Sequence, residues 1–223
     1  KIPHIAIIMD GNRRWAKLNL VNSSTGHKKG ISNAMKLLSN INRDKSLDIS
    51  IITLYVFSQD NWNRPVSEIK SLFKLIESTY LNFESMSKKE NFKINHFGSL
   101  KKIPRSIKEL INKVITKTSK NNGLIVNLAF NYSSKNEILS AINKLKGKKI
   151  SIKTLESNLF TTKIPDPDLI IRTGGEMRLS NFMLWQSAYS ELYFTKILWP
   201  NFRFNDFKKA VDNYIKRSRN YGI

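Results

Sequence analysis

The chain of 223 residues contains no cysteine, which excludes disulfides and thiolate metal sites. This composition fits a reducing compartment, and we expect a cytoplasmic location. No apolar run approaches the roughly 18 residues needed to span a bilayer, and the first residues do not resemble a signal peptide. No repeat, low-complexity linker or Gly/Ser-rich hinge divides the sequence. We therefore predict a single domain over residues 1–223, and we expect the natural N-terminus to lie upstream of Lys1.

Acidic residues are scarce. The chain has 17 Asp and Glu against 38 Lys and Arg, a formal net charge of +21. Such a charge favours polyanions, and nucleic acid, anionic lipid and phosphorylated metabolites are the three alternatives. The lysines are spread over the whole chain among many Asn and Ile residues, which indicates a compositional bias rather than a selected binding stripe. We therefore expect no nucleic-acid partner.

Six short apolar segments have the length and composition of β-strands: His4–Met9, Ile49–Phe57, Phe92–Phe97, Leu124–Phe130, Asp168–Arg172 and Glu191–Thr195. Between them, apolar residues recur with helical spacing at 31–41, 69–76, 107–115, 138–145 and 207–214. Nearly all-apolar strands that alternate with helices predict an α/β fold with a mainly parallel central sheet covered on both faces. Such sheets bind ligands at the carboxyl ends of their strands.

Three polar clusters follow predicted strands, which indicates one shared site. The first, from Asp10 to Lys17, places a carboxylate and Gly11 before a helix expected to begin near Asn12, with two arginines behind. An aspartate beside an anion-binding loop makes chemical sense if Mg²⁺ bridges it to a substrate phosphate. A plain strand-to-helix turn with Asp10 as a cap explains this cluster equally well.

The second cluster, from Ser58 to Arg64, is more polar than a plain connection requires, although an Asx-rich turn is the alternative. The third, Arg172–Phe182, surrounds a Gly pair with two arginines and a serine, as a diphosphate cradle would. Glu191 opens an apolar strand, which is a costly place for a carboxylate unless it meets a cation, either a metal or a strand-end salt bridge. His4 and His96 lie in strands and are interpreted as structural.

Five motifs occur in order from His4 to about Phe207: HIAIIMDGNRRWAK, GHKKG, LYVFSQDNWNRP, NLAFNY and DLIIRTGGEMRLSNFMLWQSAYSELYFTKILWPNF. Together they resemble the undecaprenyl diphosphate synthase family of cis-prenyltransferases. The resemblance implies a parallel sheet flanked by helices, a long apolar tunnel for the growing chain, and a homodimer.

The resemblance also implies roles for single residues. Asp10 matches the catalytic aspartate that holds Mg²⁺ on the allylic diphosphate, and Glu191 matches the second Mg²⁺ contact. The allylic diphosphate loop matches Gly11, Asn12, Arg13, Arg14 and Trp15, with His27 beside it. The loop that places isopentenyl diphosphate and takes its proton matches Ser58, Gln59, Asp60, Asn61, Trp62 and Arg64, with Asn61 as its catalytic member. The isopentenyl diphosphate clamp matches Arg172, Arg178, Leu179 and Ser180.

The sequence departs from the family pattern at several positions. Arg13 stands where the family often has Gly, Ser23 replaces an arginine, and Asp60 shortens a common Glu. Two flexible glycines are exchanged for Ser133 and Ser134, and a Gly-Asp pair reads Gly98-Ser99. No catalytic group is removed, and we expect a slower or less stable enzyme.

The expected function is the condensation of isopentenyl diphosphate onto an allylic, farnesyl-type diphosphate. The product would be a long-chain polyprenyl diphosphate, with undecaprenyl diphosphate for cell-wall glycan synthesis as the family default, and product release would bring peripheral contact with the inner face of the membrane. A trans-prenyltransferase is disfavoured because no D-D-x-x-D helix occurs. A non-catalytic subunit is the other alternative, although the chain keeps Asp10 and the RTGG motif.

Overall fold

The computed structural model describes residues 3–147 and 149–217. Its strands are β1 (His4–Ile8), β2 (Ile51–Ser58), β3 (Lys93–Phe97), β4 (Ile125–Tyr132), β5 (Leu169–Arg172) and β6 (Glu191–Phe194). Its α-helices are α1 (Asn12–Leu18), α2 (Ser23–Arg43), α3 (Val66–Lys89), α4 (Arg105–Thr118), α5 (Ser134–Lys144), α6 (Ile152–Glu156) and α7 (Phe204–Ile215). Three short 3₁₀ helices are η1 (Lys45–Leu47), η2 (Gln59–Asn63) and η3 (Trp199–Asn201).

The six strands form one sheet in the order β3-β4-β2-β1-β5-β6, and every pairing is parallel. All six predicted strands are present, and the predicted parallel sheet is confirmed. The chain starts in the middle with β1, builds one side with β2, β4 and β3, and then crosses to β5 and β6. The strand order therefore reverses at β1, and the crevice outside the carboxyl end of this strand is where such folds bind ligands.

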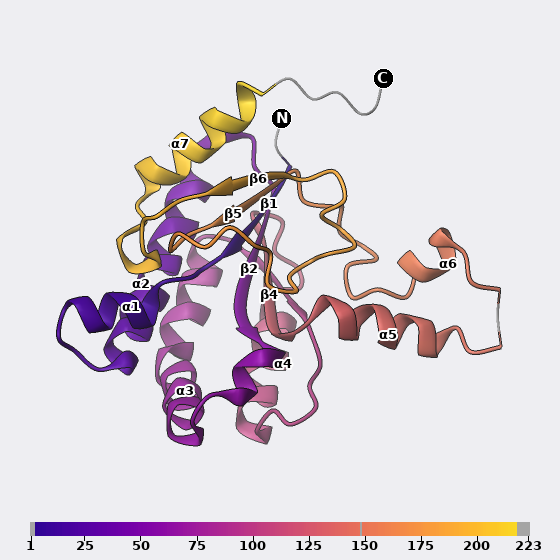
Figure 1. The fold of residues 1–223 in the computed structure, drawn as a ribbon, viewed down its shortest axis with the longest axis horizontal. Coiled ribbons are helices and arrows are strands. Elements are labelled where there is room, and N and C mark those ends of the chain that lie inside the picture. The colour runs from indigo at the N-terminus through magenta and orange to yellow at the C-terminus, as the bar shows by residue number, and fades with distance from the viewer. Residues whose placement is uncertain (1–2, 148, 218–223) are drawn as a thin grey trace.

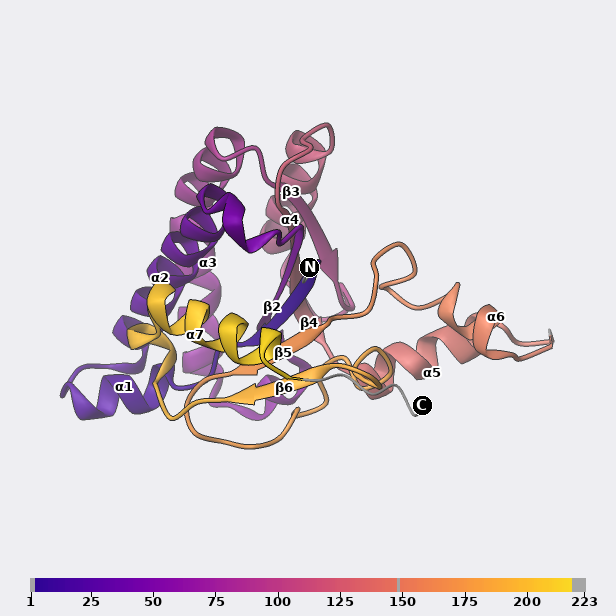
Figure 2. The same ribbon diagram turned by 90° about the horizontal axis from the view of Figure 1, so that it is seen from above.

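The two faces of the sheet are covered differently. One face carries α2, α3, α4 and α7, whose apolar residues join alternate sheet residues such as Ile7 and Ile52 in the main core. The other face packs mainly against an irregular segment that contributes Phe182 and Met183. Figures 1 and 2 both show α5 and α6 projecting away from the sheet as an arm.

The arm explains the one apolar stripe that is poorly buried. Leu139 and Ile142 belong to the predicted helical stripe at 138–145, but both are exposed, because α5 packs along its Ala141 side, against α6 and Trp185. The short helix α6 has no apolar period long enough to have been predicted. Among the described helices, none has the length and apolar character needed to cross a bilayer.

Candidate active site

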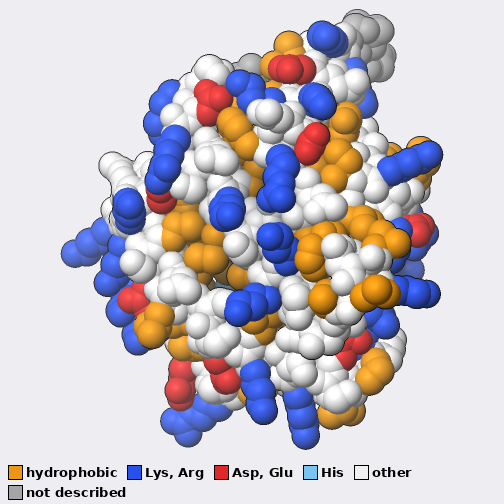
Figure 3. Space-filling view, turned by 90° about the vertical axis from the view of Figure 1, so that its left-hand side faces the viewer, with side chains coloured by type: hydrophobic (Ala, Val, Ile, Leu, Met, Phe, Trp, Pro, Cys, Tyr) orange, Lys and Arg blue, Asp and Glu red, His pale blue; other side chains and the backbone are white. Residues whose placement is uncertain are grey.

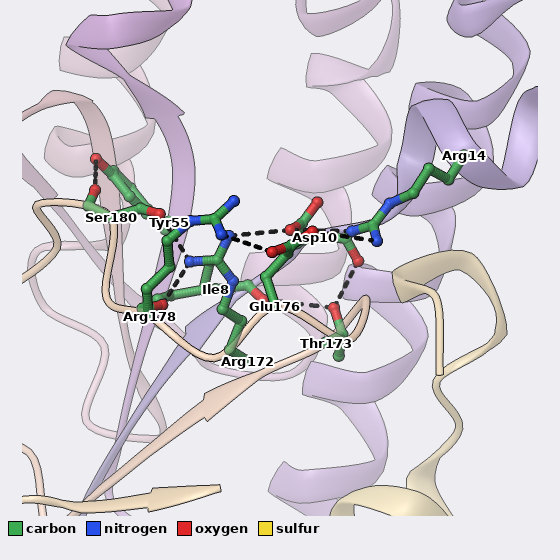
Figure 4. Close-up of polar contacts among 9 residues, drawn as sticks. All are labelled: Ile8, Asp10, Arg14, Tyr55, Arg172, Thr173, Glu176, Arg178 and Ser180. Carbon is green, nitrogen blue, oxygen red and sulfur yellow. Dashed lines mark hydrogen bonds and ion pairs between the residues drawn. The ribbon is translucent and has the colours of Figure 1, made fainter. Parts of the chain in front are cut away.

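Asp10 and Arg172 meet at the carboxyl ends of two adjacent strands. Ile8, the last residue of β1, is in register with Arg172, the last residue of β5. The Arg172 guanidinium therefore lies beside the chain that leaves β1, and its Nη2 donates to Asp10 Oδ2 at 3.0 Å. Arg14, one turn into α1, approaches the same oxygen at 3.1 Å. Figure 4 shows both arginines pointing at Asp10 from opposite sides.

The buried Arg172 side chain also organises the third polar cluster. Its Nη1 donates to the Arg178 carbonyl at 2.5 Å and to Ser180 Oγ at 2.7 Å. Its Nε is buried without a hydrogen-bond partner among the described residues. The guanidinium of Arg178 is exposed and pairs with Glu176 at 2.6 Å. The first and third clusters, predicted to share a site, are therefore joined through one arginine.

Gly174 allows this close approach. Its φ of +86° lies in the left-handed region that favours glycine, and a Cβ there would lie 2.6 Å from Arg14 Nη2. The neighbouring Thr173 donates its hydroxyl to the Asp10 carbonyl at 2.7 Å. The RTGG sequence thus fixes both the backbone and the space around Asp10.

A hollow of about 550 Å³ opens in front of these groups. It is lined by Met9, Asp10, Gly11, Asn12, Arg13, Arg14, Lys17, Ser23, His27 and Arg64. Four permanent cations, one imidazole and a single carboxylate line this space. Such a set of donors suits a phosphate or diphosphate group.

Three of the lining residues converge on Glu68 of α3, which sequence reasoning missed. Glu68 Oε1 lies 3.3 Å from Arg64, 3.7 Å from His27 and 3.7 Å from Arg13. Burial, together with the charge of Arg64, lowers the pKa of His27, although Glu68 opposes this shift. The only sequence signal for Glu68 was its place in the first turn of a helix, four residues after Arg64.

The second cluster is mostly occupied with holding its own turn. Ser58 Oγ accepts from the Asp60 amide at 3.1 Å, and Asn61 Oδ1 accepts from the Ser58 amide at 3.1 Å. Trp62 donates to Asn131 Oδ1 at 2.8 Å. Gln59 likewise donates to the Asn131 carbonyl at 3.2 Å. The Asx-rich turn accounts for these side chains, and of this cluster only Arg64 lines the hollow.

An apolar cavity of about 180 Å³ continues from the hollow into the helical layer. It runs between α2 and α3 and past α4, and its walls include Ala34, Leu72, Ile76, Tyr80 and Phe83. Met9, Asn12 and His27 line both spaces. Asn12 Oδ1 and His27 Nε2 are buried there without hydrogen-bond partners among the described residues. Residues of the predicted helical stripes at 31–41 and 69–76 line this cavity.

Comparisons with known proteins agree with this geometry. The sequence profile of the putative undecaprenyl diphosphate synthase family matches residues 8–222. An isoprenyl transferase of Treponema denticola is 43% identical over 225 aligned residues, covering 100% of this chain and 98% of the relative. One from Rickettsia typhi is also 43% identical, covering 99% and 98%.

Solved structures show the same likeness. Lavandulyl diphosphate synthase from Lavandula x intermedia, in complex with dimethylallyl diphosphate, matches with a TM-score of 0.94 and 31% identity over 100% of this chain and 98% of that one. A probable undecaprenyl diphosphate synthase from Campylobacter jejuni gives 0.83 and 31%, over 100% and 99%. The chain belongs to the undecaprenyl diphosphate synthase family. It is a prenyltransferase of the type that elongates chains with cis double bonds.

In this prenyltransferase, Glu191 does not join Asp10 within one chain. Glu191 begins β6 in register with Leu169, whereas the site lies beyond Arg172 at the other end of β5. Three residues of strand separate the two ends by roughly 10 Å. Glu191 instead pairs with Arg217 at 2.5 Å, so the salt-bridge alternative accounts for its position. Within a single chain, Glu191 therefore lies too far from Asp10 to share an ion with it, and its assignment as a Mg²⁺ contact stays a prediction.

Trp15 is also used differently from what the family resemblance implied. Its indole donates to Asn201 Oδ1 at 3.0 Å, which ties α1 to η3, and it does not line the hollow. Gly11, in contrast, has a φ of +118°, and a Cβ would come within 2.9 Å of Leu198. The tight turn predicted at Gly11 and the helix start at Asn12 are confirmed.

A buried network behind the Arg172 clamp escaped sequence reasoning. The Glu137 carboxylate accepts from the Tyr132 hydroxyl at 2.6 Å, the Phe160 amide at 2.8 Å and Gln186 at 3.1 Å. Burial raises the pKa of Glu137. Tyr55 stacks on Phe182, and burial raises the pKa of its phenol to about 12. These contacts hold the segment that carries Ser180.

The two serines that replace family glycines belong to the same support. Ser133 Oγ accepts from Asn181 at 2.8 Å, and Ser134 Oγ accepts from the Leu184 amide at 3.0 Å. Both serines are buried. Ser133 and Ser134 therefore fasten residues 180–184, which we call the clamp segment, to the start of α5. The sequence did not reveal this structural role.

Proposed function

We propose that the protein adds isopentenyl diphosphate units to farnesyl diphosphate in a Mg²⁺-dependent reaction and makes a long-chain polyprenyl diphosphate. Undecaprenyl diphosphate, a lipid carrier for cell-wall glycan synthesis, is the product we expect. One observation carries the proposal: a cationic hollow with a single carboxylate, Asp10, opens directly into an apolar cavity. This pairing suits a substrate with a diphosphate head and an isoprenoid tail.

The donor set fits Mg²⁺ held jointly by protein and substrate. Mg²⁺ commonly binds through one or two carboxylates plus substrate phosphates, and Asp10 is the carboxylate that lines the hollow. The described residues contain no cluster of three or more His, Asp or Glu that could cage a metal alone. Bound at Asp10, the ion would neutralise charge that develops on the leaving diphosphate.

Residues of α1 and its neighbours would promote the first step, the ionisation of the allylic diphosphate. The allylic C–O bond breaks and its electron pair leaves with the diphosphate, which leaves a delocalised cation. Arg14 and Arg13 donate to the departing oxygens, and Arg172 keeps Asp10 oriented. Asn12 and His27, which line both spaces, lie where the head group would join the tail.

The second substrate is held by the clamp. Arg178 and Ser180, positioned by Arg172, together with Arg64 bind isopentenyl diphosphate and bring its double bond to the cation. The new C–C bond forms from that double bond, and a proton leaves the neighbouring carbon. Asn61 with Ser58 orients this loss, the released diphosphate being the acceptor, and their mutual hydrogen bond fixes their geometry.

The proposal includes a homodimer, a cytoplasmic location and peripheral contact with a membrane that accepts the lipid product. The test is incubation with farnesyl diphosphate, labelled isopentenyl diphosphate and Mg²⁺, followed by sizing of the labelled lipid. Long labelled chains are expected, and chelation of Mg²⁺ should abolish them. Dimethylallyl diphosphate alone serves as a control, since one structural relative binds it. Folded protein that leaves no label in long lipid would refute the activity.

A further inference from the structure

The connection between α1 and α2 exposes large apolar side chains at one point. Leu18 is 75% exposed, Leu20 is 94% exposed and Val21 is also exposed. Single exposed hydrophobic residues are common on protein surfaces, but here three lie within four residues. We refer to residues 18–21 as the tip.

The backbone of the tip makes the choice of leucine more unusual. Leu20 has a φ of +55°, the left-handed conformation that helix ends usually assign to glycine or asparagine. Its amide donates to the Lys17 carbonyl at 3.2 Å, and the Val21 amide donates to the Ala16 carbonyl at 3.0 Å. Neither solvent exposure nor backbone conformation favours leucine here. Neither its exposure nor its φ gives Leu20 a role within the folded chain.

Hydrogen bonds hold the chain on both sides of the tip, which lies beside the active site. Asn22 caps α2 by accepting from the Thr25 amide at 2.8 Å, and Asn19 donates to the Trp15 carbonyl at 2.8 Å. Lys17 and Ser23, which flank the tip in sequence, both line the cationic hollow. The exposed leucines thus stand at the rim of the site that would receive the substrate.

The chain on both sides of the tip is rich in cations, of which Arg13 and Arg14 pair with Glu68 and Asp10. Residues 11–29 contain no Asp or Glu and five cations: Arg13, Arg14, Lys17, Lys28 and Lys29. Figure 3 views the molecule from the side on which α1 and α2 lie and shows Lys and Arg side chains far outnumbering acidic ones, with hydrophobic groups between them. A protruding apolar point within a basic field matches an anionic bilayer surface.

We propose that the tip inserts into the interface of a membrane containing anionic lipid, with the neighbouring lysines on its head groups. Three side chains on one connection are too few for a stable protein interface, which needs roughly 800 Å² from each partner. The same few side chains suffice for shallow insertion when head-group attraction adds to it. This inference deepens the proposed membrane contact, and its test requires neither substrate nor turnover.

The experiment is co-sedimentation of the full chain with vesicles of phosphatidylcholine containing 30% phosphatidylglycerol, compared with phosphatidylcholine alone. We expect the protein to prefer the anionic vesicles and to lose this preference at high salt. The double variant Leu18→Ser/Leu20→Ser should lower the partition coefficient by about tenfold for each leucine. The matched control is Leu139→Ser/Ile152→Ser, at exposed apolar positions of α5 and α6, and it should bind like the wild type.

Leu20→Gly separates membrane binding from folding. Glycine relieves the left-handed strain, so the thermal midpoint should be at least that of the wild type while vesicle binding falls about tenfold. Unchanged vesicle binding by the double variant, or an equal loss in the control, would overturn the inference. A change in oligomeric state by light scattering, with vesicle binding intact, would overturn it in favour of a protein partner. If the wild-type protein showed no turnover, only the proposed reaction would be refuted, and the inference on membrane binding would stand.

Discussion

The two ends of the parallel sheet each place a carboxylate against an arginine, with different consequences. At the carboxyl end, Asp10 meets Arg172 and Arg14 at the edge of a hollow that leads into an apolar cavity. At the amino end, Glu191 meets Arg217, which also donates to the Leu192 carbonyl at 3.1 Å. The Asp10–Arg172 pair faces further cations and open space. The Glu191–Arg217 pair is bound back to β6 through the Leu192 carbonyl. An ion pair at a strand end indicates a site only together with the space beside it.

The histidines repeat this contrast. His4 at the amino end is fully buried, with ring nitrogens 2.7 Å from the Pro165 carbonyl and from Thr53 Oγ1. His27 lines the hollow, and its Nε2 has no hydrogen-bond partner among the described residues. Burial lowers the pKa of both rings, so the pKa alone does not separate them. The geometry assigns a structural role to His4 and a place in the site to His27.

The largest expected effect on activity is at Asp10, at the carboxyl end of the sheet. Asp10→Asn keeps an acceptor for Arg172 but removes the charge, and we expect kcat/KM to fall on the order of 100- to 1,000-fold. Steady-state kinetics with saturating Mg²⁺ measures this effect. Asp44→Asn is the matched control, because Asp44 is also a partly exposed aspartate in an ion pair, with Lys208 at 3.3 Å, and does not line the hollow. Retention of more than a tenth of wild-type activity by Asp10→Asn would mean that Asp10 is only a cap.

The carboxyl-end clusters could be predicted because each follows an apolar segment. The nearly all-apolar segments that form β1 and β5 predicted a parallel sheet, and parallel strands bring the residues after them to one edge. Asp10 and Arg172 were therefore expected together although 162 positions separate them. The same rule, applied strictly, would have excluded Glu191, which begins its strand.

His4, at the amino end of the sheet, should make the folded protein less stable at acid pH. Burial lowers the pKa of His4 from 6.5 to about 4. The unfolded chain therefore binds a proton that the folded chain does not, and stability is lost as the pH falls from about 6.5 towards 4. The full shift corresponds to about 3 kcal/mol. Urea unfolding across this pH range, compared with His4→Gln, measures the contribution.

In the His4→Gln variant this part of the pH dependence should disappear. NMR titration of the imidazole in the native protein gives an independent check, because it does not depend on the variant folding. An apparent pKa near 6.5 for His4 would contradict the assignment. Mutation of His4 should leave the pH dependence of substrate binding unchanged, since His4 lies at the opposite end of its strand from the site.

Two glycines with similar backbone angles sharpen the comparison between site and scaffold. Gly174 has a φ of +86° and Gly147 one of +79°, but a Cβ at Gly147 would meet nothing within 4 Å. Each change to alanine should cost about 1 kcal/mol of stability, because alanine is strained in this region. Only at Gly174 would the added Cβ meet the site, 2.6 Å from Arg14 Nη2 and 3.0 Å from the Asp10 carbonyl oxygen, so only that variant should lose activity, by about tenfold. Equal activities in the two variants would argue against a role in turnover for the packing of Gly174 on Arg14 and Asp10.

Other parts of the site could not be predicted because their signals lie in tertiary contacts. Glu68 looks like any acidic residue in the first turn of a helix, yet the fold brings Arg13, His27 and Arg64 to it. Ser133 and Ser134 read as losses of glycine, although their hydroxyls hold the clamp segment. Polar residues that support a loop through one or two hydrogen bonds leave no periodic pattern in the sequence.

The smallest effect is expected at Glu191. Its ion pair with Arg217 is partly exposed on both sides, so Glu191→Gln should lower the free energy of unfolding by less than about 1 kcal/mol. Thermal unfolding measures this change. An ion at Asp10 can be reached by Glu191 only if a second copy of the chain brings its own Glu191 there. Turnover lost in Glu191→Gln and regained on mixing with Asp10→Asn chains would require such an assembly, because a mixed dimer restores one intact pair. Unchanged turnover in Glu191→Gln would show that Glu191 has only a structural role at the amino end of the sheet.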